Sequence, residues 1–303
     1  MQYFPIYLDT HTLKVLVIGA GEVACRKLDL LSRTQAMIEV IAPEVCAEVQ
    51  HYAAIGRITL TQREVTLDDL SERDLIYIAT ANHTLNLSLA AKAKELGAWV
   101  NVVDTPAACD FITPSIIDRD RLVVAISTAG AAPIYARDLR GKLEAMLPNS
   151  LAPLFDFIAQ KREEVQQLLP SGAERRRFWE RFFNTNGERF DSNTPQRYQQ
   201  CFTEATSQGE LLLIDVATPA QLLPLAALPL LQRIDRVIAL AEVTPELQEL
   251  LRRDAERAAP MSDSELVSAW QHGQRILLVV EDGELARLKA AFPFAKHLRP
   301  GAI

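Results

Sequence analysis

Two closely spaced glycines separate a short apolar run from the start of a predicted helix. Gly19 and Gly21 follow the run Val15–Ile18, and Ala24 lies three residues beyond Gly21. Glycines at this spacing allow a turn so tight that a Cβ atom would collide with its surroundings. The unpaired N–H groups of the helix start and the helix dipole attract a pyrophosphate. The pattern therefore predicts dinucleotide binding, although the same turn also occurs in other α/β proteins.

Strand and helix patterns alternate over the first hundred or so residues. Apolar runs predict strands at 37–41, 58–60, 75–79 and 99–103, and the stretch 85–96 is a predicted helix that ends at Gly97. This alternation predicts a parallel, doubly wound sheet of the Rossmann type. Ligands of such sheets bind outside the carboxyl ends of the strands.

The residues that follow these strands are the candidate cofactor contacts. A carboxylate at the tip of the second strand commonly binds the adenosine ribose. Here the tip residue is Ala42, so Pro43 and Glu44 become the candidates. The absence of an arginine at the tip favours NAD over NADP. The predicted cofactor-binding residues are Gly19, Gly21, Glu22, Val23, Pro43, Glu44, Thr80, Ala81 and Asn82.

Asp104 comes directly after the predicted strand at 99–103. A carboxylate in this position could face the nicotinamide end of a bound cofactor and accept a proton. The alternative is an aspartate that caps the turn into Thr105 and Pro106. Position alone leaves both open.

Three further regions follow along the chain. Predicted strands at 111–117 and 122–126 precede a small-residue loop at 127–133, which either receives an anion or only connects to a helix at 134–146. Residues 151–206 are helical and charged. Here Arg175–Arg177 suit a polycarboxylate or an acidic partner, or else belong to a solvated face with core aromatics beside them. Runs at 210–216, 237–241 and 276–280 predict a small carboxy-terminal α/β unit.

Composition narrows the class of protein. Hydrophobic residues at 49% and charged residues at 23% are typical of a soluble globular protein. The net charge of -7 argues against nucleic-acid binding. The four cysteines show no spacing typical of a metal site or a redox dithiol, so no metal site is expected. Neither a signal peptide nor an apolar run of about 18 residues is present, which predicts a cytoplasmic protein that does not bind membranes.

Six segments in a fixed order carry a resemblance to a known family. They are Phe4–Ile6, Val17–Lys27, Asn101–Asp104, Phe111–Arg119, Ala136–Arg140 and Glu174–Trp179. With these segments, spread over about the first 206 residues, the chain resembles siroheme synthase. The similar part is its amino-terminal module, a precorrin-2 dehydrogenase and sirohydrochlorin ferrochelatase.

The resemblance implies two reactions and a set of site residues. NAD takes a hydride from precorrin-2 while a base removes a proton, and ferrous iron then enters sirohydrochlorin. The family's catalytic aspartate corresponds to Asp104. The candidate substrate-binding residues are Ser127, Thr128, Arg137 and Arg140, and the arginines here and at 175–177 could equally lie at a dimer interface. A family loop serine that can be phosphorylated corresponds to Thr128, with Ser127 beside it. No fixed metal site is implied, because the tetrapyrrole nitrogens hold the iron.

The resemblance also implies a homodimer and four regions. These are an NAD-binding Rossmann domain at 1–113, a dimerisation segment at 114–148, a helical domain at 149–207 and an α/β domain at 208–303. The last resembles a degenerate first half of a methyltransferase. It has Val216–Pro219 and Val280–Gly283 where the family has glycine-rich turns, which predicts no methyl transfer from S-adenosylmethionine.

Two other functions remain open. The chain could be a dehydrogenase without chelatase activity, in which case it would form NADH but not accelerate iron insertion. It could also be a non-catalytic protein that binds NAD and tetrapyrroles, in which case Asp104→Ala would change little.

Overall fold

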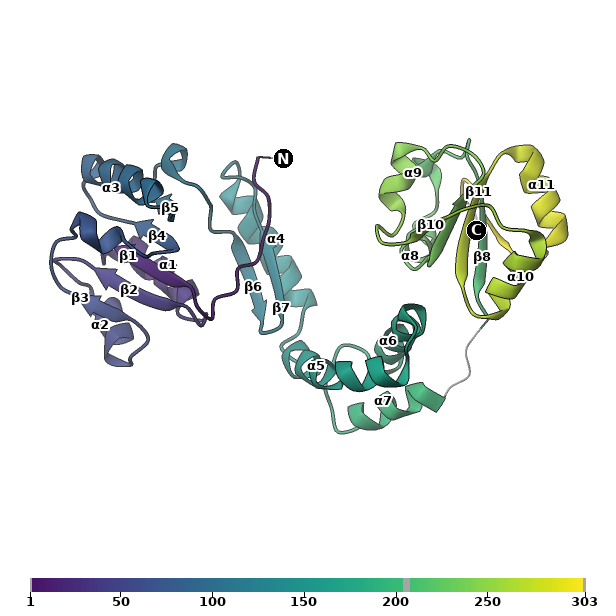
Figure 1. Cartoon of the computed structure of the whole chain (residues 1–303), viewed down its shortest axis with the longest axis horizontal. Helices are drawn as coiled ribbons and strands as arrows, with labels where there is room; N and C mark the ends of the chain where they lie inside the picture. The colour runs from purple at the N-terminus through teal and green to yellow at the C-terminus, as the bar shows by residue number, and fades with distance from the viewer. Residues whose placement is uncertain (1, 204–207, 302–303) are drawn as a thin grey trace. The chain divides into compact units, whose positions relative to one another are not determined.

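The computed structural model describes residues 2–203 and 208–301. The chain divides into two compact units, one up to Leu147 and one from Pro148, and each is described by itself (Figure 1). Within the described ranges no helix has the length and apolarity needed to cross a bilayer.

A five-stranded parallel sheet in the order β3-β2-β1-β4-β5 forms the centre of the first unit (Figure 1). The strands are β1 (Lys14–Ile18), β2 (Met37–Ile41), β3 (Thr59–Thr61), β4 (Leu75–Ile78) and β5 (Trp99–Val102). The helices are α1 (Glu22–Leu31), α2 (Ala47–Ala54) and α3 (His83–Glu95), with short 3₁₀ turns η1 (Leu67–Leu70) and η2 (Pro106–Ala108). The predicted Rossmann-type sheet is confirmed. Its strand order reverses between β1 and β4, which makes that point the expected ligand crevice.

The central strand β1 is covered on both faces. Val15 and Val17 pack in one cluster with Leu28 of α1, and Leu16 packs in another with Leu89 of α3. All five side chains are at most 2% exposed. Burial on both faces explains why this strand is an unbroken apolar run and not an alternating one.

The first unit ends in a hairpin and a helix. Strands β6 (Ser115–Arg119) and β7 (Leu122–Ile126) pair antiparallel, and α4 (Pro133–Met146) follows. The predicted strand at 111–117 is wrong at both ends. Its first part is instead tied to the parallel sheet, because the Asn101 side chain donates to the Phe111 carbonyl (2.8 Å). Asp118 and Arg119 continue the strand, and the turn begins only at Asp120, where φ is +59°.

The Asp69 carboxylate closes the turn at η1. It accepts two hydrogen bonds from Arg63 (2.6 and 2.7 Å) and two from the N–H and hydroxyl of Thr66 (2.7 and 2.9 Å). The Arg63 guanidinium holds the pKa of Asp69 well below its usual range. The charged form is therefore the one that stabilises the fold.

We predict that Asp69→Asn lowers the free energy of unfolding at pH 7 by about 1–2 kcal/mol, since charge-assisted bonds are lost. A carboxyl with a lowered folded-state pKa contributes stability above its unfolded value and loses it as pH falls through the folded value. The difference from wild type should therefore shrink below about pH 4. Urea unfolding at several pH values tests this, and a difference that stayed constant on acidification would contradict it.

The second unit begins with three helices, α5 (Leu151–Leu168), α6 (Gly172–Asn186) and α7 (Thr194–Thr203). The predicted helical stretch runs on to residue 206, but residues 204–206 lie outside those the structure describes. Phe178, Phe182 and Tyr198 are at most 2% exposed, and both phenylalanines pack edge to face against Tyr198. These aromatics form the core of the helical region.

A second parallel sheet, in the order β10-β9-β11-β8-β12, follows. Its strands are β8 (Glu210–Asp215), β9 (Arg236–Ala239), β10 (Glu256–Ala258), β11 (Arg275–Val280) and β12 (Lys296–Leu298). The helical segments are η3 (Ala220–Leu222), α8 (Ala227–Leu231), α9 (Pro245–Leu250), α10 (Asp263–Gln271) and α11 (Asp282–Ala291). The edge strands β10 and β12 were not predicted, because each has three residues and begins with a charged one.

The three consecutive arginines of α6 make contacts inside this unit. Arg175 donates to the Leu169 and Pro170 carbonyls (3.0 and 2.7 Å). Arg176 pairs with Asp235 (3.3 Å), and Arg177 donates to the Gly273 carbonyl (2.7 Å). The sequence also allowed a solvated arginine face with core aromatics beside it. The core position of Phe178 agrees with this interpretation. The arginines are not purely solvated, however, because Arg175 and Arg177 donate to backbone carbonyls.

Candidate functional site

The glycine-rich turn lies at the carboxyl end of β1, against the segment that follows β4. Gly19 has φ +102°, and a Cβ atom built there would lie 2.5 Å from the Ala79 carbonyl oxygen. The Gly19 N–H donates to the Ile41 carbonyl at the end of β2 (2.9 Å). The turn is therefore fixed between its two neighbouring strands, and only glycine fits at this position.

Gly21 differs from Gly19 in what surrounds it. It is the N-cap of α1, no side chain caps the helix, and a Cβ atom there would meet no atom within 4 Å. Packing inside the protein does not require a glycine here, so the open space lies in front of the helix start. Glu22 and Val23 are exposed there in the first turn. Unpaired N–H groups and the positive end of the dipole suit an anion such as a pyrophosphate.

The predicted ribose contacts follow β2 at the same edge of the sheet. Ala42 is buried, whereas Pro43 and Glu44 are exposed. The next residues turn back toward the glycine-rich turn, where the Cys46 N–H donates to the Ala20 carbonyl (3.2 Å). A bound dinucleotide could thus reach Glu44 from the start of α1.

The segment after β4 is held by hydrogen bonds between Thr80 and Asn86. The Thr80 hydroxyl donates to Asn86 Oδ1 (2.5 Å), and Asn86 Nδ2 donates to the Thr80 carbonyl (3.0 Å). Asn82 is the N-cap of α3, where its Oδ1 accepts from the Leu85 N–H (3.0 Å). Ala81, between them, is exposed. Sequence reasoning missed Asn86, whose signal is a polar residue at a buried position one turn into the helix.

We predict that Asn86→Ala lowers the free energy of unfolding by about 2 kcal/mol, since two hydrogen bonds of a nearly buried side chain are lost. It should also weaken dinucleotide binding by loosening the segment against Gly19. Ser88→Ala, on the exposed face of the same helix, is the matched control. Equal urea midpoints for the two variants would contradict this role of Asn86.

Asp104 lies two residues beyond β5 in a left-handed backbone conformation, with φ +55°. Residues other than glycine rarely adopt this region, and aspartate tolerates it better than most. The Asp104 side chain is exposed, and among the described residues it makes no hydrogen bond or ion pair. This geometry favours a carboxylate available to a ligand over one that caps the following turn.

Cys109 supports the turn that carries Asp104. The Cys109 sulfur accepts from the Val102 N–H (3.2 Å), and the thiol lies 3.3 Å from the Val102 carbonyl to which it donates. The Val103 N–H donates to the Ile78 carbonyl at the end of β4 (3.0 Å). The bond from Val103 to Ile78 joins the Asp104 turn to the segment beside Gly19, whereas the Cys109 contacts close the turn locally.

Lys27 on α1 reaches the segment that leads away from this edge. Its ammonium donates to the Thr113 hydroxyl (3.3 Å) and lies 5.9 Å from the centre of the Tyr77 ring. Burial lowers the pKa of Lys27 and raises the pKa of Tyr77. The contacts hold residues 111–114 on the parallel sheet.

The predicted substrate residues lie apart from the sheet edge, between β7 and the first turns of α4. The Ser127 and Thr128 hydroxyls accept from the Ala129 and Ala132 N–H groups (3.0 and 3.2 Å). Arg137 and Arg140 are exposed on α4, and Arg137 pairs with Asp138 (3.3 Å). Within the described ranges, no hydrogen bond or ion pair joins these four residues to Asp104 or to the glycine-rich turn.

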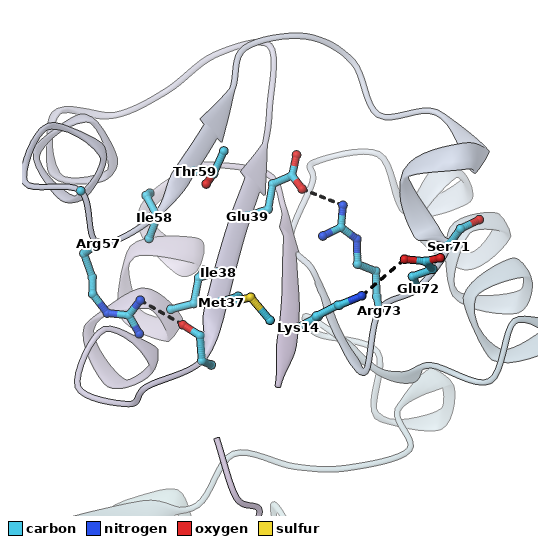
Figure 2. A pocket seen from close by; sticks show the side chains of 12 residues that line it. Lys14, Met37, Ile38, Glu39, Arg57, Ile58, Thr59, Ser71, Glu72 and Arg73 are labelled. Atoms are coloured by element: carbon cyan, nitrogen blue, oxygen red, sulfur yellow. Dashed lines mark hydrogen bonds and ion pairs between the residues drawn. The ribbon is translucent and has the colours of Figure 1, made fainter. Parts of the chain in front are cut away.

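A hollow of about 580 Å³ lies at the opposite edge of the sheet, at the amino ends of the first three strands (Figure 2). Its charges are already paired. Lys14 meets Glu72 (3.4 Å), Arg73 meets Glu39 (2.6 Å), and Arg57 donates to backbone carbonyls including Ala36 (3.0 Å). The hollow is therefore a poor ligand site compared with the carboxyl edge.

Three curated proteins named siroheme synthase align with 97% of this chain. Those of Pseudoalteromonas atlantica and Photorhabdus laumondii are 37% and 36% identical over 306 and 304 residues. Siroheme synthase 1 of Yersinia enterocolitica is 37% identical over 305 residues. The chain is homologous to the siroheme synthases. It spans 66%, 64% and 64% of the length of these three relatives.

Two family models match parts of this siroheme synthase homologue. Residues 6–115 match a family described as putative NAD(P)-binding, and residues 150–204 match the sirohaem synthase dimerisation region. The first match confirms the prediction of dinucleotide binding. A solved structure titled "SirC, precorrin-2 dehydrogenase" has the same fold, with a TM-score of 0.54 at 23% identity. The similarity covers 67% of this chain and 100% of that one.

Proposed function

We propose that this chain oxidises precorrin-2 to sirohydrochlorin with NAD as the hydride acceptor, and that it then inserts ferrous iron to give siroheme. One observation carries the proposal. Asp104 stands in a left-handed conformation at the carboxyl end of β5, on the same sheet edge as the glycine-rich turn. The homology to siroheme synthases supports the substrate class.

The residues of this edge fit a dinucleotide. The space in front of Gly21 and the uncapped start of α1 would hold the pyrophosphate, and Glu44 would bind the adenosine ribose. Because β2 and β4 flank β1 on opposite sides, an adenosine at β2 directs the other end toward β4 and β5. Thr80, Ala81 and Asn82 would pass beside that end, and Asp104 would face it. When bound, NAD supplies the acceptor for a hydride.

Asp104 would act as the proton acceptor in both reactions. As precorrin-2 gives up a hydride, the Asp104 carboxylate takes the proton that the substrate loses. The products are sirohydrochlorin, NADH and one proton. During iron insertion the same carboxylate accepts protons that leave the pyrrole nitrogens. Its exposure lets each proton pass on to water. No side chain of the chain needs to ligate the iron, which the tetrapyrrole nitrogens hold.

The substrate would be bound by cations on α4. Arg137 and Arg140 are three residues apart, so they lie on one face of the helix, and guanidinium groups pair well with carboxylates. Ser127 and Thr128 in the preceding loop would add hydrogen bonds.

A homodimer is part of the proposal. The match of residues 150–204 to a dimerisation region supports it. On α4, Ile134, Tyr135 and Met146 are 68%, 64% and 69% exposed, so a second copy would also bury apolar surface there. The bounds of the four regions, the cytoplasmic location, and the expected lack of nucleic-acid binding and of methyl transfer stay predictions.

The test is an anaerobic assay of the full chain with precorrin-2. Addition of NAD should produce NADH at a rate proportional to enzyme, and ferrous iron should then give the siroheme spectrum faster than without protein. NADH formation without accelerated iron insertion would select the dehydrogenase-only alternative. Binding of NAD and sirohydrochlorin without either reaction would overturn the enzymatic function.

A further inference from the structure

Two cysteines that lie 21 positions apart in sequence are in contact near the glycine-rich turn. The sulfur atoms of Cys25, on α1, and Cys46, at the N-cap of α2, are 2.8 Å apart and form no disulfide. Glu48, in the first turn of α2, brings a carboxylate oxygen into the same group. The three ligand atoms all lie within 4.8 Å of one another.

Two thiols and a carboxylate form a ligand set suited to a thiophilic divalent cation. Bonds of about 2.3 Å to each sulfur would put the two sulfurs roughly 3.8 Å apart in a tetrahedral site. The thiols therefore need to separate by about 1 Å, and the carboxylate is already within reach. A hollow of about 360 Å³, lined by Cys25, Asp29, Glu48 and Tyr52 among others, leaves room for a water ligand.

We propose that Cys25, Cys46 and Glu48 bind a thiophilic divalent cation of the zinc(II) class. Binding replaces the two thiol protons, which leave to water, and forms two metal–thiolate bonds. The site is separate from the ferrous iron that serves as substrate, and it does not depend on the proposed oxidation of precorrin-2.

A metal site accounts for the third member of this cluster, whereas a redox switch does not. The Glu48 carboxylate oxygen lies within 4.8 Å of both sulfurs, and formation of a disulfide would make no use of it. Arg26 also lines this hollow, but its guanidinium pairs with Glu22 (3.7 Å) on the exposed side of α1. A bound divalent cation would supply the positive charge that the two thiols lack.

The position of the site links it to the fold of the turn. The Cys25 N–H donates to the Gly21 carbonyl (3.0 Å), and the Cys46 N–H donates to the Ala20 carbonyl (3.2 Å). A cation that joins both sulfurs would tie α1 to α2 directly behind these two residues. It should therefore raise the temperature at which the chain unfolds.

The test is titration of the reduced, metal-free full chain with cobalt(II) without oxygen. One equivalent should give a thiolate-to-cobalt charge-transfer band that zinc(II) abolishes. Cys25→Ser and Cys46→Ser should each lose the band, Glu48→Gln should bind more weakly, and Cys201→Ala, in the second unit, should keep it. Should the serine variants fail to fold, the wild type still decides, because zinc(II) should protect Cys25 and Cys46, but not Cys109, from alkylation.

Three results would overturn the site. They are the absence of a cobalt band in the wild type, a band that survives in the Cys25→Ser/Cys46→Ser double variant, and alkylation of both thiols at unchanged rates with zinc(II). A Cys25–Cys46 disulfide that forms readily, without any cobalt band, would assign the pair to redox chemistry instead.

Discussion

Asp104→Asn should slow NADH formation from precorrin-2 by roughly 10²–10⁴-fold and leave the affinity for NAD unchanged. The substitution removes the proton acceptor but keeps the size of the side chain. Asparagine also tolerates the left-handed conformation at φ +55°, so the turn beyond β5 should be kept. Alanine would be a poorer test, because it adds backbone strain to the loss of the carboxylate.

Asp120→Asn is the matched control for this prediction. Asp120 is also exposed and also left-handed, with φ +59°, but it lies in the turn between β6 and β7. Its variant should form NADH at the wild-type rate. Initial rates under anaerobic conditions, together with calorimetric NAD titrations, measure both quantities. An Asp104→Asn enzyme that turns over as fast as the Asp120→Asn enzyme would refute the role of Asp104.

Gly19→Ala should abolish NAD binding and destabilise the first unit by about 3 kcal/mol. The new Cβ would lie 2.5 Å from the Ala79 carbonyl oxygen, at φ +102°. The collision is with backbone, so no side chain can move aside to relieve it. The turn and the segment after β4 must then separate, which disrupts the surface that would receive the pyrophosphate.

Gly21→Ala separates binding from folding. Its Cβ would meet no protein atom within 4 Å, and the backbone φ of −87° suits alanine. Urea unfolding should therefore match the wild type, whereas NAD affinity should fall because the methyl group occupies the space before α1. Wild-type affinity in Gly21→Ala would show that the dinucleotide does not approach the helix start.

Much of the fold follows from local patterns, because the central strands are buried on both faces. The apolar runs predicted β2 at its full length and β1 to within one residue. The pattern failed where a long-range contact decides the structure. The Asn101 side chain binds the Phe111 carbonyl, and β6 begins only at Ser115, directly after Pro114, which has no N–H to donate to a partner strand.

The residues of the candidate site likewise fall into those that local sequence patterns predict and those that they miss. The glycines, Thr80 and Asp104 could be found because each follows a predictable strand, and parallel strands end at a common edge. Asn86 and Cys109 support them through contacts only six and seven residues along the chain, with Thr80 and Val102, but which side chain makes such a contact depends on the conformation of the turn between them. The proximity of Cys25 and Cys46 likewise depends on the packing of α1 against α2 and is invisible in their spacing.

A crystal structure of the chain with NAD bound would test the central claim most directly. The account predicts that the pyrophosphate lies against Gly19 and Gly21 at the start of α1. The nicotinamide ring should lie on the β4–β5 side, with room for a tetrapyrrole between it and the Asp104 carboxylate. A nicotinamide ring over β2 and β3, or a dinucleotide in the hollow at the amino ends of the strands, would contradict it.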